Sequence, residues 1–214
     1  MVGHRALVPL VFLAVVLSLS ACVATFREGT FQPPTSWPIP TASGKQSISL
    51  FISWEISGEI SGETILDKGR YSFTHQVGRL APEVMQRWVK SIPKAYRDSG
   101  LFSDVKIGAV DTDLRAEVHV LYHGLANPTL FITVLSVGMV PSYEHNKFII
   151  TTTLKNRELQ SLGMFEKAER ATTWIGIPLI FLAPFRWHPT IIGKLVYDLN
   201  RSIISQAYDE GVVQ

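Results

Sequence analysis

The residue with the most distinctive chemistry is Cys22, the single cysteine in a chain of 214 residues. It stands at the end of an N-terminal segment with a short basic start, an apolar stretch over residues 6–19 and small residues after it. This order is the layout of a secretory signal. We therefore interpret Cys22 as the place where the protein is addressed and anchored.

The run Leu19-Ser20-Ala21-Cys22 resembles the lipobox of bacterial lipoproteins in residue types, position and order. The resemblance implies that a diacylglycerol is attached to the Cys22 thiol, that the chain is cut just before this residue, and that the new amine is acylated. These covalent lipids are the only cofactors we expect. Two or three acyl chains hold a protein firmly on a membrane, because each buried methylene contributes about 0.8 kcal/mol.

Two other interpretations of this segment are weaker. Residues 6–19 could be an uncleaved transmembrane anchor, but these 14 residues are fewer than the roughly 20 that cross a hydrocarbon core. Cys22 could be an ordinary buried thiol, but such a thiol has no reason to sit at the cleavage point of a signal. With Cys22 modified no thiol remains, so stability must come from an apolar core without disulfides.

Histidine and aspartate pairs elsewhere do not form a metal site in this interpretation. His119 and His123 fall on a predicted strand, where four residues span about 13 Å, too far to share a metal ion. Asp111-Thr112-Asp113 begins like a calcium loop, but its remaining ligand positions are not filled by oxygen ligands. We predict a turn there, and no metal.

Catalytic and nucleic-acid signatures are also missing from the sequence. It contains no Gly-x-Ser-x-Gly elbow, phosphate-binding glycine loop or dinucleotide fingerprint. The formal charge falls from +2 to +1 when Arg5 leaves with the signal, and no lysine and arginine cluster is present. We therefore predict a protein that is not an enzyme and does not bind nucleic acid.

The pattern of apolar residues predicts an α+β fold, with two helices packed on one face of a mostly antiparallel sheet. Alternation with period two indicates strands, and helical spacing indicates two helices, the first with a kink or break near Ser91 caused by Pro93. On the second helix, Leu199 is predicted to be buried and Asn200 exposed. The expected strands cover residues 48–56, 71–74, 102–107, 113–122, 144–155 and 159–170, and the expected helices cover residues 82–99 and 189–210.

The sequence divides into three segments. Residues 1–21 are the signal peptide, residues 22–46 are the lipidated anchor and a proline-rich tether, and residues 47–211 form a single domain. The tether carries three large aromatic side chains, so part of it either packs on the domain or stays free.

Two uncharged apolar segments, residues 128–141 and 172–185, have 14 residues each and are too short to span a membrane. They form either core strands, as an apolar hairpin-like pair, or a surface that contacts lipid or a partner protein. Aromatic and basic residues near the second segment are typical of a membrane interface. The candidate contact residues are Trp174, Leu179, Phe181 and Trp187.

The stretch Val137-Gly138-Met139-Val140-Pro141-Ser142 and the pair Thr173-Trp174 resemble uncharacterised envelope lipoproteins of Gram-negative bacteria. In such lipoproteins an aspartate after the lipidated cysteine favours the inner membrane, and Val23 stands there instead. The resemblance implies the periplasmic face of the outer membrane, with the inner membrane as the alternative. We predict a non-enzymatic lipoprotein that binds an envelope protein or a lipid in envelope assembly, maintenance or transport. An envelope hydrolase acting near the membrane is the alternative.

Overall fold

The computed structural model describes residues 23–29, 32–34, 36–40, 45–60, 63–71, 82–126, 129–136, 138–182, 185–186 and 188–213. Every helix and strand reported below lies after Cys22. The predicted lipidation site Cys22, the candidate contact residue Trp187 and the end of the strand predicted at residues 71–74 lie outside these ranges.

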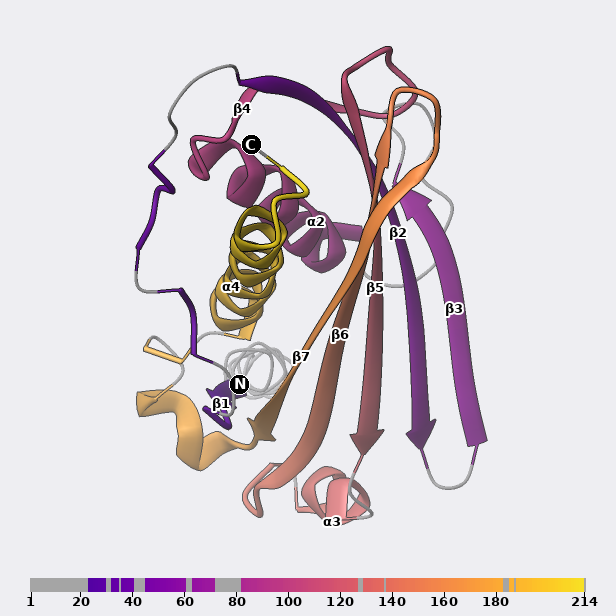
Figure 1. Ribbon diagram of the computed structural model, residues 1–214. Coiled ribbons are helices and arrows are strands. Elements are labelled where there is room, and N and C mark those ends of the chain that lie inside the picture. Colours follow the sequence, from indigo (N-terminus) through magenta and orange to yellow (C-terminus); the bar gives the residue numbers. More distant parts are fainter. Residues whose placement is uncertain are drawn as a thin grey trace, which may run out of the picture.

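A seven-stranded sheet forms one layer of the fold (Figure 1). Its order is β1-β7-β6-β5-β2-β3, and β4 pairs with β2 beside this path. The strands are β1 (Val23–Arg27), β2 (Gln46–Ile60), β3 (Glu63–Tyr71), β4 (Phe102–Ile107), β5 (Leu114–Ala126), β6 (Ser142–Asn156) and β7 (Ser161–Ile175). The long strands keep the predicted alternation: in β5, Leu114, Ala116 and Val118 are buried.

The sheet is mixed, which corrects the prediction of a mostly antiparallel one. The pairs β1–β7, β7–β6, β6–β5 and β2–β3 are antiparallel, but the central strand β2 runs parallel to both β5 and β4. A helix separates β2 and β3 from β4 and β5 in the chain. Strand β3 runs back toward the end of the sheet where β2 began, and α2 then connects it to β4, so β4 and β5 run parallel to β2.

Helices α2 (Pro82–Asp98) and α4 (His188–Asp209) pack against each other and contribute to one core with the sheet (Figure 1). Short helices α3 (Thr129–Leu135) and η1 (Ile177–Phe181) lie instead at one end of the sheet. The prediction of α+β structure is confirmed, whereas the finer arrangement differs from the predicted one. Fully buried side chains from α2, α4 and the sheet include Ile92, Tyr96, Leu195, Leu199, Ile48, Leu50, Phe148 and Ile150.

Two local predictions on the helices differ from the structure. The break that was one alternative near Ser91 is absent, because helix α2 continues through Pro93; the helix ends before Gly100, which has a positive φ of 79°. Asn200 was expected on the exposed side of α4, but it is completely buried, and its Nδ2 donates to the carbonyl of Val196. Helix α4 is buried on more than one side, because β1, β7 and the segment before β2 all pack against it.

The segment between β1 and β2 is attached to α4 where it is described. Trp37 Nε1 donates to Tyr197 Oη at 3.2 Å, and the Arg201 guanidinium lies 4.9 Å from the centre of the Trp37 ring. Ile39 is buried, and Tyr208 donates to the carbonyl of Pro40. Of the two sequence-based alternatives, packing of this segment on the domain is the one found.

A buried ion-pair network attaches β1 to the rest of the fold. The Arg27 guanidinium donates two hydrogen bonds to Glu169 on β7, at 2.7 and 2.6 Å, and one to Asp198 on α4 at 2.6 Å. The Glu169 side chain is fully buried and that of Asp198 is 4% exposed. The strand that directly follows Cys22 is therefore fixed by charge as well as by backbone pairing.

Candidate membrane-facing end

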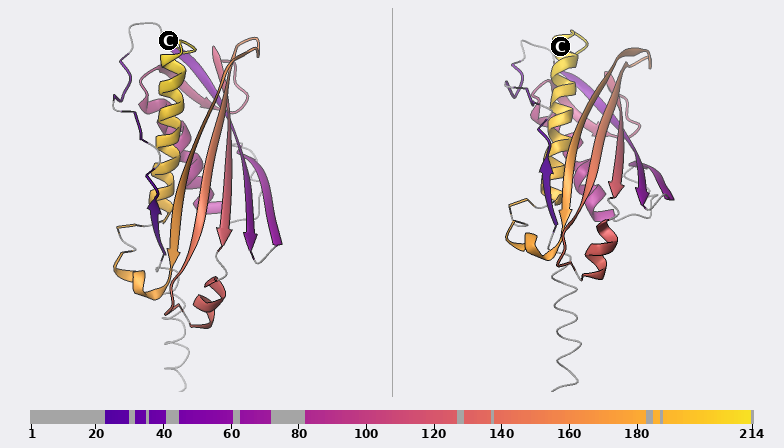
Figure 2. Two further views of the ribbon diagram at one scale, coloured as in Figure 1. Left: turned by 60° about the horizontal axis from the view of Figure 1, so that its bottom comes forward. Right: turned by 90° about the horizontal axis from the view of Figure 1, so that it is seen from below.

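Three segments that are far apart in the sequence meet at one end of the sheet. Figures 1 and 2 show α3 and η1 at the end where β1 begins and where β7 finishes. Val23, the first residue of β1, is in register with Ile175, the last residue of β7. The residue after the predicted lipidation site thus lies beside the second apolar segment, at the same end of the sheet as the first.

Helix α3 exposes apolar side chains and buries a polar one. Phe131, Val134 and Leu135 are 69%, 68% and 68% exposed, whereas Thr133 is 4% exposed. Thr133 also donates to the carbonyl of Thr129. Helices on water-soluble surfaces have the opposite distribution, with the apolar stripe facing the core. The exposed apolar face of α3 is therefore unfavourable in water and suits an apolar environment.

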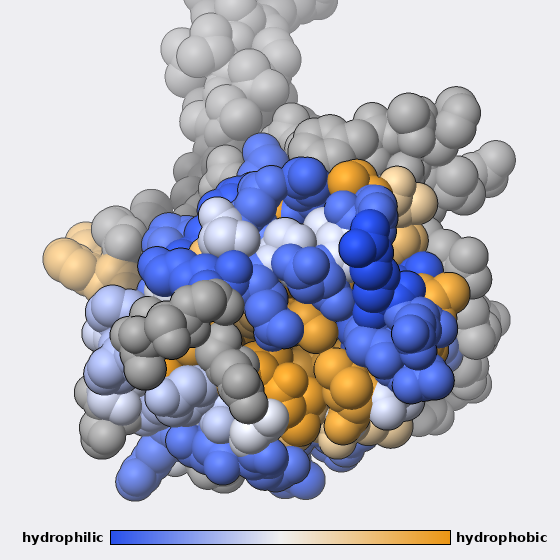
Figure 3. Space-filling view, turned by 45° about the horizontal axis from the view of Figure 1, so that its top comes forward, coloured by the Kyte–Doolittle hydropathy of each residue, from blue (hydrophilic) through white to orange (hydrophobic). Residues whose placement is uncertain are grey.

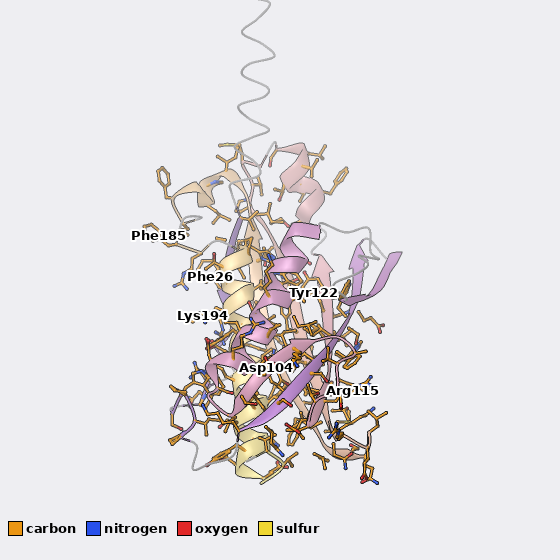
Figure 4. All side chains as sticks on the ribbon, turned by 90° about the horizontal axis from the view of Figure 1, so that it is seen from above. Phe26, Asp104, Arg115, Tyr122, Phe185 and Lys194 are labelled. Carbon is orange, nitrogen blue, oxygen red and sulfur yellow. The ribbon has the colours of Figure 1, made fainter. Side chains whose placement is uncertain are left out.

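The second segment behaves in the same way after β7 ends. Phe181 and Phe185 are 82% and 80% exposed, and Leu182 is 45% exposed. Figure 4 shows Phe185 at the edge of the molecule, beyond Phe26 and far from Arg115. The other two contact candidates in the described ranges, Leu179 and Trp174, are half-buried. Residues 129–135 and 177–181 are therefore short helices and not core strands, whereas residues 172–175 are the end of strand β7.

The two segments are joined to each other by backbone contacts. Ile177 N donates to the carbonyl of Gly138 at 2.8 Å. A Cβ atom on Gly176 would lie 2.9 Å from the Cα of Pro141, so only glycine fits this junction without a shift. We refer to α3, residues 138–141, η1, Leu182 and Phe185 together as the apolar tip.

Aromatic side chains lie between the apolar tip and the polar part of the sheet. Trp174 on β7 and Tyr143 on β6 are opposite each other in register, with ring centroids 5.2 Å apart. Arg186 lies 5.3 Å from the ring of Phe26 on β1. Tryptophan, tyrosine and arginine are enriched where a protein crosses from hydrocarbon to head groups.

Behind the tip, polar side chains form a connected chain between the sheet and α4. Tyr122 donates to Glu144 and is in hydrogen-bond contact with Asn146, whose Nδ2 donates to Thr173 Oγ1 at 2.9 Å. His188 Nδ1, at the start of α4, lies 2.8 Å from Thr25 Oγ1 and 3.3 Å from Thr173 Oγ1. This network satisfies the polar groups that the open end of the core would otherwise leave unpaired.

Burial sets the charge state of two members of this network. It lowers the pKa of His188 to about 4 and raises the pKa of Glu144 above its usual value. The imidazole is therefore neutral at pH 7. The Thr25 hydroxyl and His188 resemble a nucleophile and base in distance, but Thr25 has no exposed surface. A substrate could reach this hydroxyl only if β1 moved away from α4.

The remaining residues considered in the sequence have ordinary partners. Asp113 accepts hydrogen bonds from the amide and hydroxyl of Ser47, and Asp111 pairs with Arg157. His119 lies 3.0 Å from Ser53 Oγ. Within the described ranges, no cluster of three or more histidine, cysteine, aspartate or glutamate side chains has the geometry to hold a metal ion. Helices in those ranges are too short or too polar to span a bilayer.

The opposite end of the sheet carries a smaller apolar group on the β6–β7 hairpin. Leu159, Leu162 and Met164 are 58%, 41% and 69% exposed. Figure 3 is turned toward this end and shows hydrophilic residues over much of the surface around a central hydrophobic area. Because these hairpin residues match the exposure of the tip but lie far from Val23, they are a natural control for it.

Sequence reasoning found the two apolar segments but missed four of their most exposed residues: Phe131, Val134, Leu135 and Phe185. The signal that could have found them is the absence of charge combined with Thr133 at helical spacing from Thr129. An uncharged helix with threonines on its inner side has its apolar residues on the outer side.

Comparison with known proteins gives limited information. No protein-family model matches the sequence, and no curated protein does. A variant PelC dodecamer from Paraburkholderia phytofirmans is 10% identical, with 83% of this chain and 97% of that chain covered at a TM-score of 0.24. A second PelC dodecamer from the same organism is 11% identical, with the same coverage and a TM-score of 0.23. These scores are too low to establish a common fold or function.

Proposed function

We propose that the protein is a non-enzymatic lipoprotein of the Gram-negative envelope, anchored through Cys22 on the periplasmic face of the outer membrane. In this proposal the apolar tip lies in the outer part of the bilayer and binds lipid during envelope assembly, maintenance or transport. The inner membrane is the alternative location. The proposed contact residues are Trp174, Leu179, Phe181 and Trp187 from the sequence, together with Phe131, Val134 and Phe185, whose exposure supports the proposal.

The observation that carries this proposal is the reversed polarity of α3 beside the start of β1. Burying a phenylalanine, leucine or valine side chain stabilises by about 1.5–3 kcal/mol. Helix α3 leaves three such side chains about two-thirds exposed while it buries Thr133. A bilayer would cover these side chains, and an acylated Cys22 would hold the bilayer next to Val23.

Two other interpretations predict different behaviour. A protein partner on the tip would leave the lipid-free chain unable to bind pure lipid vesicles. The hydrolase alternative has a nucleophile and base in Thr25 and His188, and it predicts an activity that Thr25→Val abolishes. Because Thr25 is completely buried, we favour the binding function.

The test is binding of a chain that begins at Val23 to neutral phosphatidylcholine vesicles, measured by co-sedimentation. This chain lacks the lipid anchor but keeps every described strand and helix. The wild type should bind, and the double variant Phe131→Asp/Phe181→Asp should bind at least ~100-fold more weakly. The two phenylalanines contribute about 3–6 kcal/mol when fully buried, and each 1.4 kcal/mol is tenfold in affinity.

The matched control is Leu159→Asp/Met164→Asp on the distant hairpin, where the side chains are 58% and 69% exposed. This variant should bind vesicles like the wild type, and both variants should keep the wild-type circular dichroism spectrum. The proposal is wrong if the wild type does not bind vesicles, or if the two double variants lose binding equally.

A further inference from the structure

A groove of about 390 Å³ is lined by side chains from β5, β6 and β7. It lies on the face of the sheet away from α2 and α4, the two helices that Figure 1 shows on one side of the sheet. Side chains on β6 identify the face, because His145 and Lys147 are exposed whereas Asn146 and Phe148 between and beside them are buried. The groove is lined by His123 and Leu125 on β5, His145, Asn146 and Lys147 on β6, Arg170 on β7 and Glu28 after β1.

Two cationic side chains stand next to each other at its centre. Lys147 and Arg170 are directly opposite in the register of β6 and β7, and His123 is opposite Lys147 from the other side. Like charges at directly opposite positions destabilise a sheet. Within the described part of the chain, neither Lys147 nor Arg170 has an acidic partner that would relieve this repulsion.

Glu28, the acidic residue in the lining of the groove, interacts with other residues. The Glu28 carboxylate accepts a hydrogen bond from Thr172 Oγ1 at 3.1 Å and lies 3.6 Å from His145 Nδ1. Glu28 therefore interacts with Thr172 and His145, which lie nearer to the tip, and does not neutralise Lys147 or Arg170. An anion placed between these two side chains would accept charge-assisted hydrogen bonds from both.

We infer that this groove binds the negatively charged head group of a membrane lipid, through its phosphate. The inference rests on the proposed function, because it takes the tip as the membrane side. Arg170 precedes Trp174 by four residues on the same face of β7, a distance of about 13 Å along a strand. At membrane interfaces, lysine and arginine side chains bury their apolar stems and keep the charged group in the head-group layer.

A lipid fits the groove better than a free anion because one wall is apolar. Leu125 is 44% exposed and stands opposite His145 in the register, so it lies one row nearer to the tip than Lys147. The groove thus runs from an apolar side chain near the tip to a pair of cations above it. A phosphate with acyl chains below it has the same order of apolar and charged parts.

The experiment uses the full lipidated protein in a neutral detergent, mixed with equal amounts of anionic phosphatidylglycerol and zwitterionic phosphatidylcholine. Native mass spectrometry then counts the lipids that stay bound. The wild type should retain phosphatidylglycerol severalfold over phosphatidylcholine, and Lys147→Gln/Arg170→Gln should lower that ratio to about one. The control Lys90→Gln/Arg97→Gln removes two exposed charges from α2 and should keep the wild-type ratio.

Three results would overturn the inference. One is a ratio near one in the wild type, and another is an equal loss of preference in the control variant. The third is displacement of phosphatidylglycerol by an equal concentration of inorganic phosphate, which would identify a site for a free anion. Binding to neutral vesicles does not require Lys147 or Arg170, and the lipid ratio in detergent does not require the tip. A failure of the lipid-head-group inference can therefore be distinguished from a failure of the proposed function.

Discussion

The Arg27 network gives a prediction whose size follows from burial. In Arg27→Met the side chain keeps most of its length but loses its charge, so the fully buried Glu169 carboxylate loses both hydrogen bonds from the guanidinium. Removing one partner of a buried ion pair costs about 3–5 kcal/mol. We expect the lower end, about 3 kcal/mol, because Arg27 is 20% exposed and Asp198 still has Arg201 at 3.6 Å.

The measurement is urea unfolding at pH 7 of a chain that begins at Val23, for the wild type and the variants. Adding Glu169→Gln to Arg27→Met should restore a large part of the lost stability, because no uncompensated charge then remains on β7. If Arg27→Met lowers the free energy of unfolding by less than 1 kcal/mol, or if the double variant is no more stable than the single one, the network does not hold β1 as described.

Three further predictions concern residues around the tip and the core. Burial lowers the pKa of His188 from 6.5 to about 4, so between these two pH values the unfolded chain binds a proton at His188 that the folded chain does not. The free energy of unfolding of the wild type should therefore fall by up to about 3 kcal/mol more than that of His188→Gln between pH 6.5 and pH 4. Both proteins contain Glu144, whose raised pKa has the opposite effect on stability, so its contribution cancels in this comparison. Gly176→Ala should lower the melting temperature, because its Cβ would lie 2.9 Å from the Cα of Pro141. A variant as stable as the wild type would contradict the close contact between Gly176 and Pro141. Asn200→Asp should destabilise by about 3–5 kcal/mol, because the completely buried position would then hold an uncompensated carboxylate. Denaturant unfolding should show almost no change for the exposed control Asp209→Asn.

Sequence patterns were sufficient for the long elements and their buried faces. Period-two alternation placed Leu114, Ala116 and Val118 of β5 in the core, and helical spacing did the same for Leu195 and Leu199 of α4. These patterns depend on one face of an element meeting one core. Asn200 escaped this reasoning, because α4 is enclosed by β1 and other segments as well as by the sheet, and a helical wheel does not include these contacts.

The direction of the central strands and the state of the apolar segments could not be predicted in this way. Alternation in β2 and β5 shows which residues are buried but not whether the strands run parallel, which depends on the crossover through α2. An uncharged segment such as residues 128–141 is compatible with burial in a core or in a bilayer, since both environments are apolar. Only the placement of α3 at the end of the sheet separates these two alternatives.

The groove residues show a third limit of prediction from the sequence. Lys147 and Arg170 are 23 positions apart, and they come together only through the register of the β6–β7 hairpin. The sequence predicted a pair of strands here but not their register, so the two cations were not recognised as neighbours. A hairpin register follows from its turn, which here is closed by Asn156 and Gln160.

The most direct test of the central claim is the depth of single spin labels in the lipidated protein bound to liposomes. Cys22 is the single cysteine, so a cysteine placed at Phe131, Phe181 or Leu162 can be labelled alone once Cys22 carries its lipid. We predict that labels at Phe131 and Phe181 are accessible to oxygen in the hydrocarbon and protected from a water-soluble relaxation agent, and that the label at Leu162 behaves in the opposite way. Labels at Phe131 and Phe181 that are as accessible to the water-soluble agent as the label at Leu162 would contradict the membrane-facing tip.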